Sequence, residues 1–458
     1  MLSYENIQDA MGVSIAMSNE MANAVYAWNN AYMNKAPWLN TKEGIKSLQL
    51  PSAVCSEMAR IVTMESQLSL TGSARADYIK KQLRLPMSKL RQDVEYACAK
   101  GGIVYKPYPC GDNIAIDIVQ ADNFFPVAFD SNRKITAAIF PEFKKVGKKL
   151  YIKLEYHALE GDTYIIQNRA FYSESASVKV NDILRLGTEI PLGIVPEWED
   201  LEPYGEIGGI EKPLFSYFKI PLANNIDPNS QLGVSLYSRS MDLIQDADEQ
   251  YGATIWEYKS KETAVQAGRE FFDHDRYGNT RMPSGKERLY FVLGDSMDNR
   301  GNPFFNVYSP EIRDQSFFNG FNNILKRIEF NCNLAYGTLS DPNNIDKTAE
   351  EIKMSKQRSY STVKDIQNSL ENALEDLVYG VDVWASLENL APPGQIEMAI
   401  NWDDSIIVDK EKELLSMQQD AALGMIRKEI YISKKYGVTE EEAIKMMPSM
   451  ATQFPDEE

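Results

Sequence analysis

The chain has 458 residues and a formal net charge of −18 at pH 7, and 43% of its residues are hydrophobic. The length indicates several structural units, and the apolar content excludes a disordered chain. No run of about 18 apolar residues occurs, and the N-terminus lacks a basic region followed by an apolar one, so neither a membrane span nor a signal peptide is expected. The acidic balance has the wrong sign for a protein that grips nucleic acid through clustered Lys and Arg. The same acidic balance is compatible with a protein that lets a polyanion slide past it with little adhesion.

The first hundred residues are predicted to be helical. Apolar spacing favours a helix over residues 5–34, and an aromatic group at its end, formed by Trp28, Tyr32 and Trp38, is interpreted as core. Further helices are predicted from Leu50, over residues 73–85 and over residues 87–100. Gly101-Gly102 is a natural C-cap for the last of these helices. The four cysteines (Cys55, Cys98, Cys110 and Cys332) have no metal-like spacing, so we expect reduced, structural thiols in a cytoplasmic setting.

The period of the apolar residues changes to two over residues 103–190. Ile114, Ile116 and Ile118 alternate with polar residues, as do the apolar residues of 150–156, 163–166 and 177–180. Turn signals such as Gly111-Asp112 separate these runs. The pattern predicts an antiparallel meander, followed by a proline-rich and acidic connector over residues 191–232.

Two helices flanking a small irregular insert are predicted next. The first begins near Leu232-Gly233 and continues to residue 258, and the second begins at Ser309-Pro310, a good N-cap and N1 pair. The second helix has its apolar residues at Phe317, Phe321, Ile324, Ile328 and Cys332. The insert, residues 259–308, is rich in Gly, Asp, Asn and Arg and contains one clear strand at 289–293.

The longest predicted element is a helix over residues 346–387. Its apolar residues recur at steps of three and four: Val363, Ile366, Leu370, Ala373, Leu377, Val381, Trp384 and Leu387. Thr348 and Glu351 supply a capping box, and the helix would be about 60 Å long at about 1.5 Å per residue. Basic residues fill its first half and acidic residues its second, an order that opposes the helix dipole. Either these charges form a solvated, salt-bridged face, or the basic end meets an anionic partner.

The chain ends with a strand around residues 396–402, helices over 410–436 and 440–447, and an acidic tail. No catalytic constellation stands out, and no cofactor or metal is expected. The histidine in Asp273-His274-Asp275 could belong to a metal site, but a polar turn explains it as well. Asp403-Asp404 resembles part of an acidic nuclease site, although adjacent strand residues point to opposite faces.

Several strings resemble the portal proteins of tailed bacteriophages, in particular the SPP1-like portals of Gram-positive siphophages. The resemblance is carried by residues 310–321 (PEIRDQSFFNGF), 327–342 (RIEFNCNLAYGTLSDP), 347–358 (KTAEEIKMSKQR) and 402–407 (WDDSII). Upstream, Ala223-Asn-Asn, residues 232–237 (LGVSLY) and Asp246-Ala-Asp are similar to the entry into the family's stem helix. The aromatic residues near position 30 and Leu50-Pro51 also fit. The resemblance covers most of the chain and is strongest from about 223 to 407.

The resemblance implies an α+β, mainly helical subunit of a ring, typically of twelve copies, at one capsid vertex of a virion. It assigns an N-terminal wing to residues 1–232, made of helices (1–102), antiparallel strands (103–190) and the connector (191–232). Stem helices are implied at 233–258 and 309–334, with the clip between them at 259–308. The remaining parts are a channel loop (335–346), a long wing helix (347–388), a wing strand (389–408) and crown helices (409–458).

By the same resemblance, the protein is not an enzyme but a conduit for DNA packaging and ejection, made in the host cytoplasm. The implied partners are double-stranded DNA passing without sequence specificity, a large terminase, a head–tail adaptor, and the major capsid and scaffolding proteins. No membrane is among them. The residues expected nearest DNA in the loop are Thr338, Ser340, Asn343 and Asn344. Contacts to DNA or to a neighbouring subunit are expected for Lys347, Lys353, Lys356 and Arg358.

Two other classes remain open at this point. One is a capsid or tail-adaptor protein of the same virion that has no channel. The other is a metal-dependent nuclease centred on Asp275 or on Asp403-Asp404.

Overall fold

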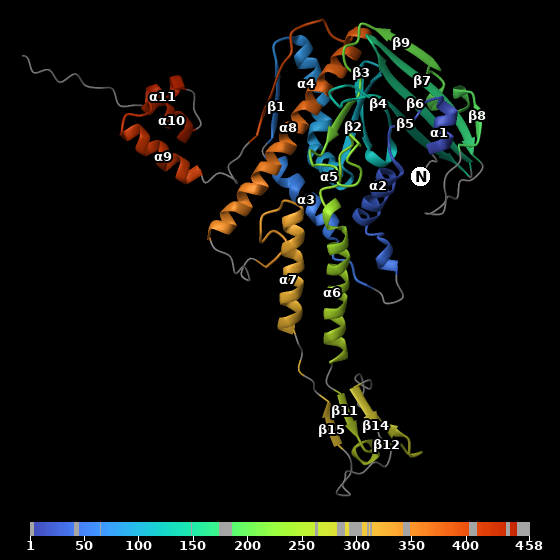
Figure 1. Ribbon diagram of the computed structural model, residues 1–458, viewed down its shortest axis with the longest axis vertical. Coiled ribbons are helices and arrows are strands. Elements are labelled where there is room, and N and C mark those ends of the chain that lie inside the picture. The colour runs from blue at the N-terminus through green and yellow to red at the C-terminus, as the bar shows by residue number, and fades with distance from the viewer. Residues whose placement is uncertain are drawn as a thin grey trace, which may run out of the picture. The chain divides into compact units, whose positions relative to one another are not determined.

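The computed structural model contains helices and strands in two compact units (Figure 1). One unit comprises residues 1–63 and 68–399, and the other comprises residues 64–67 and 400–458. The structure describes residues 4–40, 45–64, 66–147, 149–173, 186–261, 264–281, 289–292, 305–308, 311, 314–341, 349–402, 410–436 and 440–446.

The first part of the larger unit is helical, as predicted, with two exceptions. Its helices are α1 (Tyr4–Met11), α2 (Asn19–Tyr32), α3 (Leu50–Val62), α4 (Ala74–Ser88) and α5 (Leu90–Lys100). The single helix predicted over residues 5–34 is broken at Gly12, which has a φ of 69°. A short strand, β1 (Gln67–Thr71), pairs with β16 (Glu397–Asn401), and the prediction of an all-helical segment missed it. Gly101 adopts φ 90° and ends α5, which confirms the predicted C-cap.

Two sheets follow, and their antiparallel order confirms the predicted meander. The smaller sheet has the order β10 (Ser216–Lys219), β2 (Gly102–Cys110), β3 (Asn113–Gln120). The six-stranded sheet has the order β4 (Phe125–Phe129), β5 (Ile135–Val146), β6 (Lys149–Glu160), β7 (Thr163–Ser173), β8 (Thr188–Ile190), with β9 (Tyr204–Gly208) also on β7. The strand expected at 177–180 lies outside the described residues. The predicted irregular connector therefore contains two strands, β9 and β10, which its proline and acidic residues did not indicate.

Helix α1 covers one face of the six-stranded sheet (Figure 1). Ile7 and Met11 from the helix pack with Ile139, Ile152 and Leu154 from the strands, and all five are buried. Each such buried side chain contributes about 1.5–3 kcal/mol relative to an exposed one.

Helix α6 (Met241–Ser260) begins eight residues later than the start expected at residue 233. The intervening residues form turns because they pack into the helical part of the unit. Val234 and Tyr237 are fully buried, and the Tyr237 hydroxyl donates to the Trp28 carbonyl over 2.8 Å. Gly233 passes so close to Gly101 that a Cβ on it would lie 1.9 Å from the Gly101 oxygen. Tertiary packing thus overrides a pattern that fits a helix.

Helix α7 (Asp314–Asn331) lies beside α6, and the insert between them contains short strands (Figure 1). Its three-stranded sheet has the order β14 (Tyr290–Val292), β11 (Ala264–Ala267), β15 (Phe305–Tyr308), and a hairpin joins β12 (Asp273–His274) to β13 (Thr280–Arg281). The strand predicted at 289–293 is confirmed as β14. The Ser309-Pro310 cap lies outside the described residues.

Helix α8 (Ala349–Leu387) is 39 residues long and confirms the long helix. Of the predicted apolar stripe, Val363, Ile366, Leu370, Ala373, Leu377 and Val381 are buried, whereas Leu387 is 45% exposed. The capping Thr348 lies outside the described residues.

Two acids in the acidic half of α8 form ion pairs within the chain. Asp376 forms ion pairs with Lys134 and Lys212, each at 2.9 Å, and Asp382 lies 3.6 Å from the buried Arg75. These pairs favour the salt-bridge interpretation for this half of the helix.

The smaller unit contains α9 (Lys410–Ala422), α10 (Lys428–Tyr436) and α11 (Glu440–Met446). The helix expected over residues 410–436 is divided near Gly424, which has a φ of 76°. No helix in the described part of the chain is long and apolar enough to cross a membrane.

All four cysteines are unpaired thiols. Cys55, Cys98 and Cys332 are fully buried, and burial raises the pKa of Cys332 to about 12. Only Cys110 is exposed. The buried three therefore act as small apolar side chains of the core.

A buried carboxyl group on α5 gives a testable pH dependence. Asp93 is 4% exposed, and its Oδ2 has no hydrogen-bond partner among the described residues. Burial raises the pKa of Asp93 to about 7 from 3.8. Between these two pH values the folded state holds a proton that the unfolded state releases. The destabilisation of the folded state by Asp93 is therefore absent below pH 3.8 and complete above about pH 7.

We expect Asp93→Asn to raise the free energy of unfolding by about 2–4 kcal/mol near pH 8 and by almost nothing near pH 4. Urea unfolding at several pH values measures this difference. Asp200→Asn is the matched control, because it makes the same substitution at an exposed carboxyl. Its effect should not vary with pH; equal pH profiles for the two variants would contradict the assignment.

Candidate functional site: the loop between α7 and α8

The segment that leaves α7 is held by a buried carboxylate. Glu329 is fully buried in the last part of α7. Its Oε1 accepts hydrogen bonds from the backbone N–H groups of Leu339 (2.6 Å) and Ser340 (2.8 Å), and its Oε2 accepts the Ser340 hydroxyl (2.9 Å). One side chain thus satisfies three donors of the loop, which fixes the loop against the helix.

Further contacts hold the loop from both helices. The side-chain Oδ1 of Asn322 on α7 accepts the N–H of Asp341 (2.8 Å), and the Ser355 hydroxyl on α8 accepts the N–H of Tyr336 (2.9 Å). The loop backbone up to residue 341 is therefore tied to α7 and α8 at several points.

Arg358 on α8 packs on the same segment. Its guanidinium lies 4.4 Å from the ring centre of Phe330 and 5.5 Å from that of Tyr336, and it donates to the Leu334 carbonyl over 3.3 Å. A cation over two aromatic faces stabilises such a junction by about 0.5–2 kcal/mol.

The structure describes two of the four loop residues that were predicted to lie nearest DNA. The Thr338 hydroxyl donates to the Ala335 carbonyl over 2.6 Å and is half-buried. Ser340 is 4% exposed and bonded to Glu329, so its side chain is an internal anchor in the single chain. Asn343 and Asn344 lie outside the described residues, and their proximity to DNA stays a prediction.

The two described side chains among the basic residues predicted for DNA or subunit contact differ in their surroundings. Lys356 is exposed on α8, whereas Arg358 is engaged by the two aromatic rings. Lys347 lies outside the described residues, and Lys353 is on α8 with its side chain outside them. The structure therefore leaves Lys356 available on the surface and gives Arg358 a structural role within the chain.

Sequence reasoning missed Glu329, the central residue of this site. The signal was present, because Glu329 falls between Leu325 and Cys332 on the buried stripe of α7. An acid at such a position is rarely buried unless it is paired or hydrogen-bonded.

Large apolar side chains on α6, α7 and the small sheet are uncovered in the single chain. Trp256 on α6 is 67% exposed, Phe318 on α7 is 51% exposed, and Phe305 on β15 is 55% exposed. An open cavity of about 1060 Å³ lies beside Trp256 and is also lined by Ile45, Lys46 and further residues of α6, with Ile324 from α7. Each of these three aromatic side chains therefore leaves apolar area uncovered in the single chain.

The candidate metal residues form a turn. The carboxylate of Asp275 accepts the N–H groups of Tyr277 and Asn279, each at 2.8 Å, and the Asn279 side-chain amide at 3.0 Å. The described residues contain no group of three or more His, Cys, Asp or Glu side chains placed to hold a metal ion. Asp403 and Asp404 lie outside these residues.

No protein-family model and no curated protein sequence matches the chain. Among solved structures, the chain is similar to one from the neck of a native GTA particle, a structure computed with C12 symmetry. The two chains share 10% sequence identity with a TM-score of 0.44, and the alignment covers 95% of this chain and 99% of the other.

Proposed function

We propose that the chain is the subunit of a portal ring, the channel through which double-stranded DNA enters and leaves a phage-like capsid. The observation that carries this proposal is the uncovered apolar surface on α6, α7 and the small sheet, with Trp256, Phe318 and Phe305 each more than half exposed. Burying a large aromatic side chain at about 25 cal/mol per Å² stabilises an assembly, so these elements are suited to contact other copies of the chain.

The order of elements supports the same proposal. Two antiparallel helices carry a small sheet, a firmly anchored loop follows, and a 39-residue helix comes next. This is the order of stem, clip, channel loop and wing helix that the sequence resemblance implies. In this arrangement Glu329 and Arg358 support the base of the channel loop.

In a ring, the chain would act passively. A net charge of −18 per subunit limits adhesion of DNA to the channel. A terminase ATPase would supply the work of packaging, and the clip would dock this motor and later a head–tail adaptor. Capsid and scaffolding proteins would surround the ring in the virion.

The test is the mass and symmetry of the purified protein, measured by mass photometry and negative-stain class averages. We expect a ring of about twelve copies with a central hole. Trp256→Glu should abolish the ring by placing a charge in the contact, whereas Val146→Glu should leave it intact. Val146 is a matched control because it is 53% exposed at the end of β5, away from these elements.

A small closed oligomer without a hole would contradict the portal proposal and favour the adaptor alternative. A ring that tolerates Trp256→Glu would show that α6 does not form the contact.

A further inference from the structure

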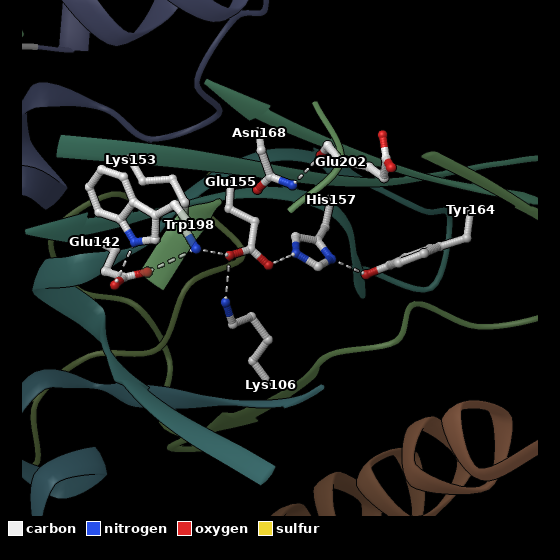
Figure 2. Close-up of polar contacts among 9 residues, drawn as sticks. All are labelled: Lys106, Glu142, Lys153, Glu155, His157, Tyr164, Asn168, Trp198 and Glu202. Carbon is white, nitrogen blue, oxygen red and sulfur yellow. Dashed lines mark hydrogen bonds and ion pairs between the residues drawn. The ribbon is translucent and has the colours of Figure 1, made fainter. Parts of the chain in front are cut away.

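A buried chain of polar side chains runs through the six-stranded sheet and reaches β2 of the smaller sheet (Figure 2). Glu155 on β6 is at its centre. Its Oε2 accepts Lys106 of β2 at 2.9 Å and Lys153 at 3.3 Å, and its Oε1 lies 2.6 Å from His157 Nε2. His157 Nδ1 lies in turn 2.7 Å from the hydroxyl of Tyr164 on β7. None of these polar side chains contributes to the loop site described above.

The chemistry of each group fixes the direction of these hydrogen bonds. Two lysines hold the pKa of the Glu155 carboxyl well below its usual range, together with His157, although burial opposes them. A carboxylate only accepts, so His157 Nε2 must carry the proton and donate. Burial keeps the His157 ring neutral by lowering its pKa. Nδ1 is therefore an acceptor, and the Tyr164 hydroxyl donates a hydrogen bond to it. Burial raises the pKa of the Tyr164 hydroxyl well above its usual value, and the backbone N–H of Leu214, which faces the Tyr164 oxygen, opposes this shift.

The surroundings disfavour a second proton on His157. The ring is 4% exposed, and the Phe140 and Phe215 rings lie with their centres 5.4 Å and 6.3 Å from its own. The charged groups that face it are Glu155 and Lys153 on β6, Lys106 on β2, and beyond them Glu142 on β5 and Asp117 on β3. Their net charge of one negative favours a second proton, but burial outweighs it and lowers the pKa of His157.

The far end of the chain reaches the segment that contacts α8. Residues on both sides of Leu214, within 211–216, contact α8. The N–H of Glu211 donates to the Tyr379 hydroxyl over 2.9 Å, and Lys212 pairs with Asp376. The Ser216 hydroxyl donates to the Ala373 carbonyl. Position 214 therefore connects the six-stranded sheet to the long helix.

We propose that the Glu155–His157–Tyr164 chain is an acid-sensitive joint between the six-stranded sheet and residues 211–216. A proton taken up at His157 Nδ1 turns that atom into a donor that faces the Tyr164 hydroxyl. The Tyr164 hydroxyl proton would then lose its acceptor, and a buried imidazolium would lie against the Phe215 ring of residues 211–216. Separation of residues 211–216 from the six-stranded sheet lets water reach both groups, so it occurs more readily in acid.

The sign of the effect follows from linkage. The unfolded histidine has a pKa of 6.5 and the folded one a lower pKa, so the unfolded or opened state binds the extra proton. The joint is complete above pH 6.5 and weakens as the pH falls below this value. With one proton linked, the opening equilibrium rises by up to about tenfold per pH unit.

Hydrogen exchange followed by mass spectrometry on the full chain tests the joint. Exchange of peptides covering residues 211–216 is compared between about pH 7.5 and pH 5.5, corrected for the intrinsic pH dependence of exchange. We expect the opening of this segment to increase by up to about tenfold in the wild type. His157→Gln should remove the increase, because an amide accepts and donates but does not take up a proton in this range.

Tyr164→Phe decides the case if His157→Gln fails to fold. It leaves His157 without its donor at Nδ1, so protonation of the folded ring becomes easier, its pKa moves closer to 6.5, and the acid-induced increase in opening should become smaller than in the wild type. An increase as large as that of the wild type in Tyr164→Phe would overturn the proposal. So would wild-type protection that is equal at both pH values, or an increase that persists in His157→Gln.

Discussion

Glu329→Ala should release the loop between α7 and α8 and destabilise the chain by about 3–5 kcal/mol. The substitution leaves two buried backbone N–H groups and the Ser340 hydroxyl without their acceptor, at about 1–3 kcal/mol for each unpaired group. Urea unfolding measures the loss of stability. Limited proteolysis, read by mass spectrometry, should show new cleavage within residues 334–341.

Glu329→Gln is the matched control for this variant. The amide oxygen can replace Oε1 and accept both backbone N–H groups, and the amide nitrogen can donate to the Ser340 hydroxyl. We therefore expect a loss of less than about 1.5 kcal/mol and no new cleavage. A loss as large as that of Glu329→Ala would show that the charge of Glu329, rather than its hydrogen-bond geometry, holds the loop.

Glu155→Ala should destabilise the chain by about 3–5 kcal/mol, because it leaves two lysines buried without their shared partner. Lys106 and Lys153 are 8% and 5% exposed, and both bond to Glu155 Oε2. Breaking a buried ion pair from one side costs about this much, since the remaining charge is left in a poorly solvated place. Thermal and urea unfolding at neutral pH measure the effect.

Glu142→Ala provides the comparison for Glu155→Ala. Glu142 also pairs with Lys153, at 2.8 Å, but its side chain is 52% exposed, so water can replace it. We expect a loss of about 1 kcal/mol or less. Equal losses for the two variants would mean that solvent reaches both carboxylates, and the buried character of the Glu155 cluster would be wrong.

The extent of sequence-based prediction depends on the element. The long helix α8 was predictable, and its end at Leu387 agrees with the prediction, because a regular apolar stripe suffices to indicate such an element. The start of α6 was not predictable, because Ser235 and Tyr237 are held in turns by hydrogen bonds to residues more than a hundred positions away. Strands β9 and β10 were missed for a related reason, since each is short and is defined by pairing with a distant strand.

The loop site shows the same division. The sequence indicated a loop between two helices and named Ser340 and Arg358 as important, but it assigned both to external contacts. The structure turns Ser340 toward Glu329 and Arg358 toward Phe330 and Tyr336. Side-chain direction depends on which helix faces are brought together, and local spacing does not contain that information.

The sequence by itself determined the local elements: amphipathic helices, an alternating meander, turn positions at glycines, and a strongly acidic balance. These follow from interactions between residues a few positions apart and from composition. Tertiary structure alone decided that Glu329 and Glu155 are buried acceptors and that Arg75 and two lysines pair with Asp382 and Asp376 of α8. It also decided that aromatic side chains on α6 and α7 stay uncovered. The physical reason is that burial and ion pairing join residues tens to hundreds of positions apart, and only the packed chain specifies which of them meet.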